Sequence, residues 1–305
     1  MERLRGSVVI PSWNAAAVLG PCLASLRRQQ LRGGFETIVV DNGSTDGTDA
    51  LLRQNADWVE AIRNAENAGY AGANNQAAAR ARGSILYLLN SDTELLEPNV
   101  LELLAQAVED PRVGLAGPKL LNPDGTLQPS CAAHPTVTRS LIAGAGLHRL
   151  LPDAAVRRIA PESWSHDRSA DADWLLGAVL AIRTDLYLEM DGLWATEYAE
   201  DQDIAYRVQR RGLAVRFVEP ARVMHIGNFT LAQHRSDAQR AARVAEAELA
   251  FLREYYSRPR ATAIRAIVWC AYAGRAVVHR LLGRAARAEL FRAMARVYAP
   301  DRARG

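Results

Sequence analysis

The chain of 305 residues, 49% hydrophobic and 23% charged, is long enough for one large domain or two smaller ones and is typical of a soluble globular protein. Its net charge of +3 conceals an asymmetry, because residues 258–305 carry eleven arginines against Glu289 and Asp301. Three scattered cysteines without a Cys-x-x-Cys pair exclude a disulfide framework and a zinc site, and they predict a reducing, cytoplasmic location. Residues 1–6 run directly into a strand-like sequence, so no signal peptide is expected.

Strand-like and helix-like segments alternate four times along the first 110 residues. We expect strands at 7–13, 35–42, 58–64 and 84–92, and helices around 18–30, 45–54, 71–82 and 98–110. Such alternation indicates an α/β fold in which helices cover a mostly parallel sheet.

The pattern changes after residue 114. Residues 128–170 show no clear periodicity, so a mobile loop and a small helical insertion are both open. A buried strand and a short helix are expected over 172–190, an amphipathic helix over 200–212 and a strand over 214–220. From Ser236 onward the sequence predicts helices, with a break at Arg258-Pro259.

Polar residues follow three of the first four strands at the point where each ends. Asn14 comes after the first strand, Asp41 closes the second and Asp92 follows the fourth. In a parallel sheet these ends converge on one edge, where ligands bind. One such residue alone is explained by a helix N-cap, but three of them, with the asparagine-rich segment 67–75, predict a polar ligand site.

The glycines restrict the kind of ligand. The sequence has no Gly-x-Gly-x-x-Gly after its first strand and no Gly-x-x-x-x-Gly-Lys-[Ser/Thr], which disfavours a dinucleotide fold and a P-loop. Gly69 and Gly72 would let the backbone approach a ligand closely.

Two further polar groups lie downstream. Glu200, Asp201 and Asp203 open a predicted helix, where acidic residues suit the helix dipole. A carboxylate there, beside the aromatic loop that precedes it, could instead act as a general base. His225 is either a structural histidine or a nitrogen ligand to a divalent metal that Asp92 also holds.

These segments together resemble the inverting glycosyltransferases of family two, and within them the rhamnosyltransferase-like branch. The resemblance spans roughly residues 7–230 and rests, in chain order, on VVIPSWN, IVVDNGSTDGT, NAGYAGANNQA, LYLLNSDTELLEP, WLLGAVLAIRTDLYLEMDG, EDQDIAYRVQRRG and VMHIGN. It implies the GT-A nucleotide-diphospho-sugar transferase fold, with a Rossmann-like, mostly parallel sheet. That domain would cover residues 1–235, with a nucleotide-binding half to about 115 and an acceptor half over 116–235. Residues 236–305 would form a C-terminal basic helical extension.

The resemblance also implies roles for residues. Asp92 ends the family's Asp-x-Asp motif and, with His225, would hold a Mg²⁺ or Mn²⁺ that bridges the diphosphate, while Asn90 replaces the motif's first Asp. Asp201 corresponds to the catalytic base, which Glu200 would orient. The donor-binding positions are Pro11, Ser12, Asn14, Asp41, Asn67, Gly72, Asn74, Asn90 and Asp92.

One segment departs from the family. Relatives carry Gly-Phe-Asp-Glu ahead of the acidic pair, whereas this chain has Gly-Leu-Trp-Ala-Thr at 192–196 and is about two residues shorter. The acceptor side of the site is therefore expected to differ.

The expected reaction transfers a sugar from a nucleotide-diphospho-sugar, with dTDP-rhamnose as the best candidate, to a glycan or polyprenyl-linked glycan in cell-envelope polysaccharide biosynthesis. Two alternatives are a catalytically silent nucleotide-sugar-binding scaffold and a sugar nucleotidyltransferase. The second would need a glycine-rich loop that PSWNAAAV, residues 11–18, lacks.

The basic tail mixes apolar residues with arginine over 261–297. Interior arginines argue against a true membrane span. A basic amphipathic helix on an anionic membrane, through residues 258–305, would make the protein peripheral on the inner face of the plasma membrane. The alternative is a helical pair packed back on the domain. Little aromatic interleaving argues against nucleic acid, and a homodimer stays open.

Overall fold

The computed structural model describes residues 4–194, 199–227 and 236–300, and the chain divides into two compact units. The first unit is Met1–Ala132, Ser165–Ala195 and Glu200–Thr230, and the second is Ala133–Trp164, Thr196–Ala199 and Leu231–Gly305. Residues 133–164 thus group with the C-terminal helices. The domain boundary expected at residue 235 stays a prediction.

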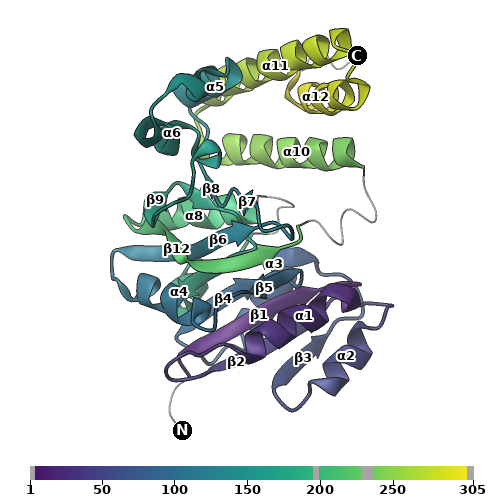
Figure 1. The fold of residues 1–305 in the computed structure, drawn as a ribbon, viewed down its shortest axis with the longest axis vertical. Helices are drawn as coiled ribbons and strands as arrows, with labels where there is room; N and C mark the ends of the chain where they lie inside the picture. Colours follow the sequence, from purple (N-terminus) through teal and green to yellow (C-terminus); the bar gives the residue numbers. More distant parts are fainter. Residues whose placement is uncertain (1–3, 195–198, 228–235, 301–305) are drawn as a thin grey trace. The chain divides into compact units, whose positions relative to one another are not determined.

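The first unit is built on a mixed sheet of ten strands (Figure 1). Its strands are β1 Gly6–Ser12, β2 Phe35–Asp41, β3 Val59–Arg63, β4 Ile85–Leu89, β5 Thr93–Leu95, β6 Val113–Leu121, β7 Leu127–Gln128, β9 Ala170–Ala172, β11 Val179–Arg183 and β12 Ala214–His225. The main path runs β3-β2-β1-β4-β11-β6-β12-β5. Strands β3, β2, β1 and β4 are parallel, so their carboxyl ends share one edge, and the expected α/β sheet is confirmed.

Helices connect these strands, as the alternating pattern predicts. They are α1 Ala16–Arg27, α2 Thr48–Gln54, α3 Gly69–Ala78, α4 Val100–Glu109, α7 Thr184–Glu189 and α8 Glu200–Arg210. Apolar spacing explains which faces are buried: all five residues of β4 are buried, while α4 buries Val100, Leu101, Leu104, Ala105 and Val108 along one face. A separate pair of two-residue strands, β8 Cys131–Ala132 and β10 Trp174–Leu175, completes the unit.

Strand β12 is longer than expected. It continues through residue 225, whereas the sequence predicts its end at Pro220. Its pairing with β6 shifts register between Val218 and Arg222, around this proline. Because proline has no N–H to donate, it is tolerated where a ladder is interrupted, and here the strand resumes beyond it.

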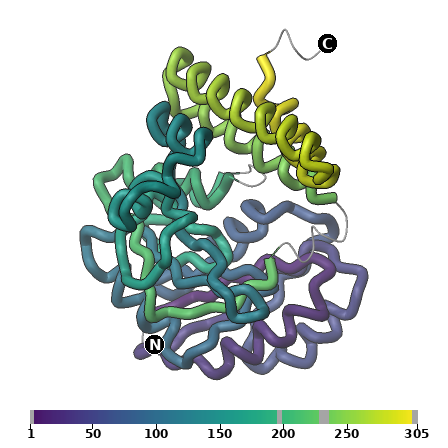
Figure 2. Tube along the Cα trace, turned by 45° about the horizontal axis from the view of Figure 1, so that its top comes forward, coloured from purple at the N-terminus to yellow at the C-terminus, as the bar shows by residue number. Residues whose placement is uncertain are grey.

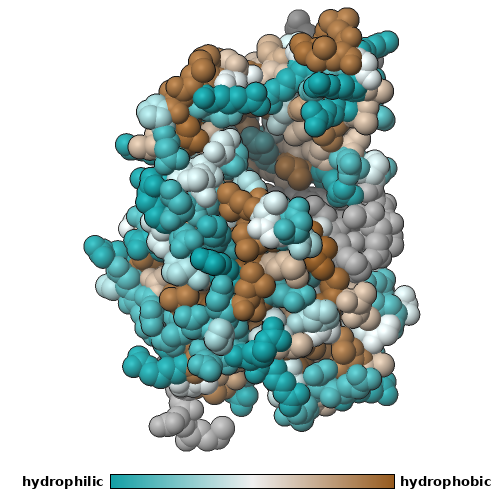
Figure 3. Space-filling view, in the orientation of Figure 1, coloured by the Kyte–Doolittle hydropathy of each residue, from teal (hydrophilic) through white to brown (hydrophobic). Residues whose placement is uncertain are grey.

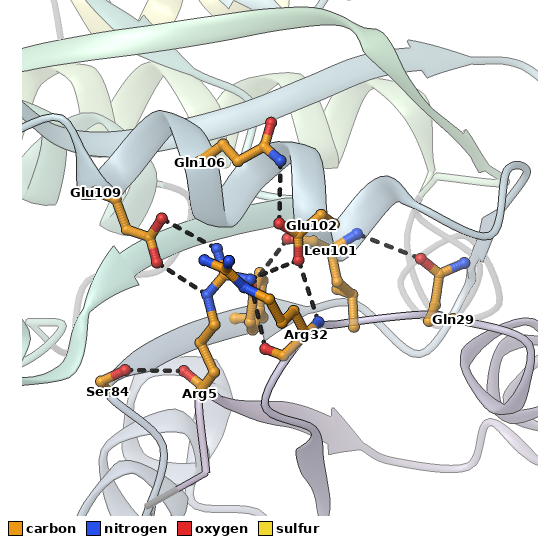
Figure 4. Close-up of polar contacts among 9 residues, drawn as sticks. Arg5, Gln29, Arg32, Ser84, Leu101, Glu102, Gln106 and Glu109 are labelled. Carbon is orange, nitrogen blue, oxygen red and sulfur yellow. Dashed lines mark hydrogen bonds and ion pairs between the residues drawn. The ribbon is translucent and has the colours of Figure 1, made fainter.

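Arg5 joins the start of β1 to α4 (Figure 4). Its guanidinium donates two hydrogen bonds to the Glu109 carboxylate, at 2.8 and 3.0 Å, and one to Glu102 at 2.5 Å. The Arg5 side chain is only 11% exposed. Charge-assisted, two-pronged bonds of this kind are stronger than neutral ones, so they fix β1 and thereby the polar loop at its far end.

The second unit is helical (Figure 2). It contains α5 Val137–Gly144, α6 Asp153–Ile159, α10 Asp237–Tyr255, α11 Arg258–Leu281 and α12 Ala285–Tyr298, with short 3-10 turns η1 Leu147–Leu150 and η2 Pro161–Ser163. Residues 128–170, for which the sequence allowed either a loop or a helical insertion, are therefore helical in part. Pro259 lies in the first turn of α11, where the break was expected. The core is formed by Ala245, Leu249, Leu252, Ile264 and Tyr298.

Among the helices that the structure describes, α11 is long and apolar enough to cross a membrane by length and composition. An 18-residue window has a mean hydropathy of 1.3 and is 11% buried.

Candidate active site

The loops after β1 and β2 are tied together. Asn14 has a left-handed backbone, φ 49°, which asparagine tolerates. Its Oδ1 accepts a hydrogen bond from the Thr45 backbone N at 2.8 Å, and its own N donates to Ser44 Oγ at 2.9 Å. The Asp41 carboxylate accepts from the Ser44 N at 3.0 Å. Two predicted donor-binding residues therefore shape one loop.

Pro11 and Ser12 lie on the same edge. They pair in register with Val40 and Asp41 across the β1–β2 ladder. Ser12 is 2% exposed, and its Oγ has no hydrogen-bond partner within the described residues. A buried hydroxyl without a partner is uncommon and is often completed by a ligand or water.

Asn67 and Asn74, which follow the third strand, form hydrogen bonds at the start of α3 and within it. Asn67 Oδ1 accepts from the Gly69 N at 2.8 Å, and α3 begins at Gly69, two residues earlier than expected. Asn74 Nδ2 donates to the Tyr70 carbonyl at 3.0 Å, while its buried Oδ1 has no partner in the described chain. Gly72 lies in the middle of this helix. Their contacts with a donor stay predictions.

Asp92 and His225 are brought together by strand pairing. β5 directly follows Asp92 and pairs antiparallel with the end of β12, with Thr93 opposite His225. His225 Nε2 lies 3.4 Å from Asp92 Oδ1. Both side chains are about nine-tenths buried, with exposed fractions of 9% and 10%. The predicted metal ligands are thus neighbours.

Gln128 determines which nitrogen of His225 carries the proton. Its Oε1 lies 2.7 Å from His225 Nδ1, and its Nε2 donates to Asn122 Oδ1 and to the His225 carbonyl. With the amide in this orientation Nδ1–H is the donor, so in the neutral imidazole the lone pair is on Nε2. A lone pair and a carboxylate oxygen 3.4 Å apart repel unless a cation or proton lies between them.

Asn90 lies in the turn before Asp92. Its N donates to the Ala178 carbonyl at 2.9 Å, and its carbonyl accepts from Thr93 Oγ1 at 2.7 Å. The buried Asn90 Oδ1 has no partner among the residues described. This turn therefore places a buried amide oxygen without a partner in the described chain two residues before Asp92.

Asp201, in the first turn of α8, accepts a hydrogen bond from the Gly177 N at 3.0 Å. Burial raises the pKa of its carboxyl from 3.8 to about 6, against the lowering effect of backbone N–H bonds from Gly177 and Gln202. The Tyr70 hydroxyl donates to the Gly177 carbonyl at 3.1 Å. Burial, with the nearby charges of Glu200 and Asp201, raises the pKa of Tyr70.

Residues 177 and 178 link the two acidic positions. Gly177 bonds to Asp201, and the adjacent Ala178 bonds to the turn residue Asn90. The raised pKa of Asp201 suits a group that takes up a proton near neutral pH. The arrangement therefore combines a position for a cation with a carboxylate that can act as a base.

The remaining acidic residue of the cluster, Asp203, is structural. Arg207 Nε donates to Asp203 Oδ2 at 2.8 Å, and both residues are buried. The same guanidinium donates to the Met190 and Gly192 carbonyls, each at 2.7 Å. This ion pair holds the loop that leads toward α8. The altered 192–196 segment extends beyond the described residues after Trp194.

Sequence reasoning missed three residues. Tyr70 belongs to the quoted NAGYAGANN segment, and its aromatic character was the available signal. Gly177 acts through its backbone, and Gln128 lies in a stretch without periodicity, so neither had a local signal.

The chain is similar in sequence to known glycosyltransferases. Residues 7–129 match Glycosyl transferase family 2. The uncharacterized protein y4gI of Sinorhizobium fredii is 31% identical over 216 residues, covering 68% of this chain and 23% of that protein. N-acetylglucosaminyl-diphospho-decaprenol L-rhamnosyltransferase of Mycobacterium tuberculosis is 28% identical over 235 residues, covering 72% and 75%.

Solved structures show the same fold. A mannosyltransferase from Pyrobaculum calidifontis in complex with GDP-Man and Mn²⁺ superposes with a TM-score of 0.61 at 19% identity, covering 96% of this chain and 86% of that chain. At this identity the likeness concerns the fold alone. The chain spans about a quarter or less of the first two relatives, 23% of y4gI and 18% of the O-antigen biosynthesis protein RfbC of Myxococcus xanthus.

Proposed function

Because the chain belongs to glycosyl transferase family 2 and has a GT-A fold, we propose that it transfers a sugar from a nucleotide-diphospho-sugar to an acceptor hydroxyl, with inversion at the sugar carbon. The observation that carries the proposal is the link through residues 177 and 178, which joins Asp201 to the turn that bears Asp92.

The pair Asp92–His225 fits a divalent cation. A hard carboxylate oxygen and a neutral imidazole nitrogen suit Mn²⁺ or Mg²⁺, and the Nε2 lone pair is turned toward the carboxylate. No three His, Cys, Asp or Glu side chains form a complete metal cluster in the described ranges. Two protein ligands leave room for diphosphate oxygens. When bound, such a cation would neutralise the charge that develops on the leaving diphosphate.

Asp201 acts as the base in this proposal. The attacking hydroxyl must lose its proton as the new glycosidic bond forms, and a carboxylate with a pKa of about 6 accepts it while remaining ionised at neutral pH. The Gly177 N–H fixes the carboxylate's position, the Tyr70 hydroxyl holds the Gly177 carbonyl, and Glu200 adds negative charge near Tyr70.

The donor and acceptor belong to the proposal as well. The mycobacterial relative is named as an L-rhamnosyltransferase that acts on a decaprenol-linked N-acetylglucosamine, which supports dTDP-rhamnose and a polyprenyl-linked glycan for this chain. Cell-envelope polysaccharide synthesis on the inner face of the plasma membrane follows from those substrates.

Thermal unfolding with UDP-, GDP- and dTDP-sugars, with and without Mn²⁺, tests the proposal. Donor at roughly a hundred times its dissociation constant adds about 2.7 kcal/mol to the free energy of unfolding. We expect one donor to stabilise the wild type in a Mn²⁺-dependent way, and Asp92→Ala to abolish this effect. Asp57→Ala, at an exposed carboxylate, is the matched control and should keep it. No stabilisation by any donor would favour the silent-scaffold alternative.

A further inference from the structure

The end of α11, the turn after it and the start of α12, residues 277–287, expose an unusual amount of apolar side chain. We name this segment the α11–α12 tip. Within six residues it exposes Val277 by 58%, Val278 by 53%, Leu281 by 81% and Leu282 by 58%. In Figure 3 brown apolar side chains reach the surface over these helices, next to teal polar ones. Single exposed apolar residues are ordinary, but a contiguous group marks an interaction site.

Arginines lie close in sequence to these apolar side chains. Arg280, Arg284 and Arg287 are all exposed in the same eleven-residue tip. Over residues 258–300 the sequence has nine arginines and a single acidic residue, Glu289. The tip therefore combines an apolar point with a strong positive charge that no acidic residue within it offsets.

The chain geometry makes the tip a protrusion. Gly283 has a left-handed backbone, φ 70°, with no atom within 4 Å of the position where a side chain would begin. α11 and α12 pack against one another further along, where His279 and Tyr272 stack with Phe291. Leu281 and Leu282, which follow His279, thus lie beyond this stacking contact, while Val277 and Val278 are exposed one turn earlier on α11.

We propose that the α11–α12 tip inserts into the headgroup region of an anionic lipid bilayer. Apolar side chains would enter the boundary between headgroups and acyl chains, and the arginines would reach back to lipid phosphates along their aliphatic stems. A symmetric contact with a second copy would place arginine against arginine, which disfavours that occupant. The inference rests on the tip alone and is independent of the proposed reaction.

Vesicle flotation with the full chain tests the inference. The probes are phosphatidylcholine vesicles with and without phosphatidylglycerol. We expect binding only to the anionic vesicles and release by molar salt, since salt screens the surface charge. Replacing Arg280, Arg284 and Arg287 together by Gln should weaken binding by roughly a hundredfold, because each arginine near an anionic surface contributes about fivefold.

Matched variants separate the tip from the rest of the surface. Leu281→Glu should abolish binding, whereas Leu150→Glu, at a leucine of the same 81% exposure in η1, should leave it unchanged. Replacing the exposed Arg27, Arg53 and Arg80 by Gln removes the same charge elsewhere and should also keep binding. Circular dichroism confirms that each variant is folded.

Three outcomes would overturn the inference. Binding to neutral vesicles alone, or equal losses in Leu281→Glu and Leu150→Glu, would show that the tip is not the membrane contact. Bound protein that salt cannot release would indicate a membrane-spanning α11 instead. A monomer–dimer change in Leu281→Glu, measured by light scattering without lipid, would identify the tip as a contact between copies of this chain.

Discussion

His225 Nε2 lies 3.4 Å from Asp92 Oδ1, although one residue ends β12 and the other follows β4. The contact depends on the pairing of β5 with β12. Its electrostatics depend on Gln128, whose Oε1 is 2.7 Å from His225 Nδ1 and leaves the Nε2 lone pair directed at the carboxylate. The position of His225 thus depends on strand pairing, and its tautomer depends on the contact with Gln128.

Gln128→Met should weaken Mn²⁺ binding by about 10–100-fold, the usual effect of removing a residue that orients a metal-binding histidine. The side chain keeps its volume but loses the acceptor for Nδ1–H. Gln128→Glu is the control, because a carboxylate still accepts that proton and should retain affinity. Manganese paramagnetic resonance in the presence of nucleoside diphosphate measures the bound fraction. Equal weakening in both variants would contradict a role for the tautomer.

The pKa of Asp201 predicts opposite effects on activity and stability. Burial raises it from 3.8 to about 6, so between these values the folded state binds a proton that the unfolded state releases. Stability therefore falls as pH rises through this window and stays lower above it. A base must be ionised, so kcat/KM should fall about tenfold per pH unit below about pH 6.

Asp201→Asn separates the two effects. Loss of the base should lower activity by about 10²–10⁴-fold, while stability above pH 6 should rise by about 1–2 kcal/mol. The full shift would correspond to about 3 kcal/mol, and we discount it because the residue keeps partial solvent access. Tyr70, whose pKa the charge of Asp201 helps to raise, is unchanged. Urea unfolding at several pH values measures the gain, with the exposed Asp185→Asn as control. If Asp201→Asn still stabilised the protein at pH 4, where the Asp201 carboxyl is protonated, burial of its charge would not explain the gain in stability.

The sequence predicts a residue's role where that role follows from the helix or strand to which the residue belongs. The all-apolar run before Asn90 predicts a buried strand, and therefore places Asp92 at a ligand-binding edge. The meeting of Asp92 with His225 was not readable from spacing, because it depends on antiparallel register between β5 and β12 and on the strand resuming after Pro220. Gly177 contributes only backbone atoms, and the tight space that a Cβ would meet there, 3.1 Å from the Asp201 Cβ, depends on the tertiary fold.

Arg207→Ala should cost about 3–5 kcal/mol, because it leaves the buried Asp203 carboxylate without its ion pair. It also removes the donor to the Met190 and Gly192 carbonyls. Arg210→Ala, at an exposed position of the same helix, is the control and should cost less than about 1 kcal/mol. Urea unfolding compares the two. Similar losses would mean that the ion pair adds nothing beyond helix propensity.

Gly192→Ala should disrupt the loop before α8, chiefly through a clash with the Asn75 side chain, while Tyr187 Cε1 lies 3.0 Å from the same Cβ position. Gly192 has φ 66°, and a Cβ there would lie 2.2 Å from Asn75 Oδ1. That oxygen already accepts from the Leu193 N at 2.9 Å and the Tyr187 hydroxyl at 2.6 Å, so it is not free to move. Gly212→Ala is the matched control, since φ is 77° but no atom lies within 4 Å. Both variants bear the left-handed strain of about 1–2 kcal/mol.

The difference between the two glycine variants isolates the clash. Gly192→Ala should lose about 1–3 kcal/mol more than Gly212→Ala in urea unfolding, the usual cost of overpacking. Asn75→Ala removes the obstructing oxygen, so in that background Gly192→Ala should cost no more than the control. If the excess loss persists without the Asn75 side chain, the contact with Tyr187 Cε1, 3.0 Å from the same Cβ position, accounts for it and the Asn75 oxygen does not. If it disappears, Asn75 and Gly192 form one unit that holds the entrance to the helix bearing Asp201.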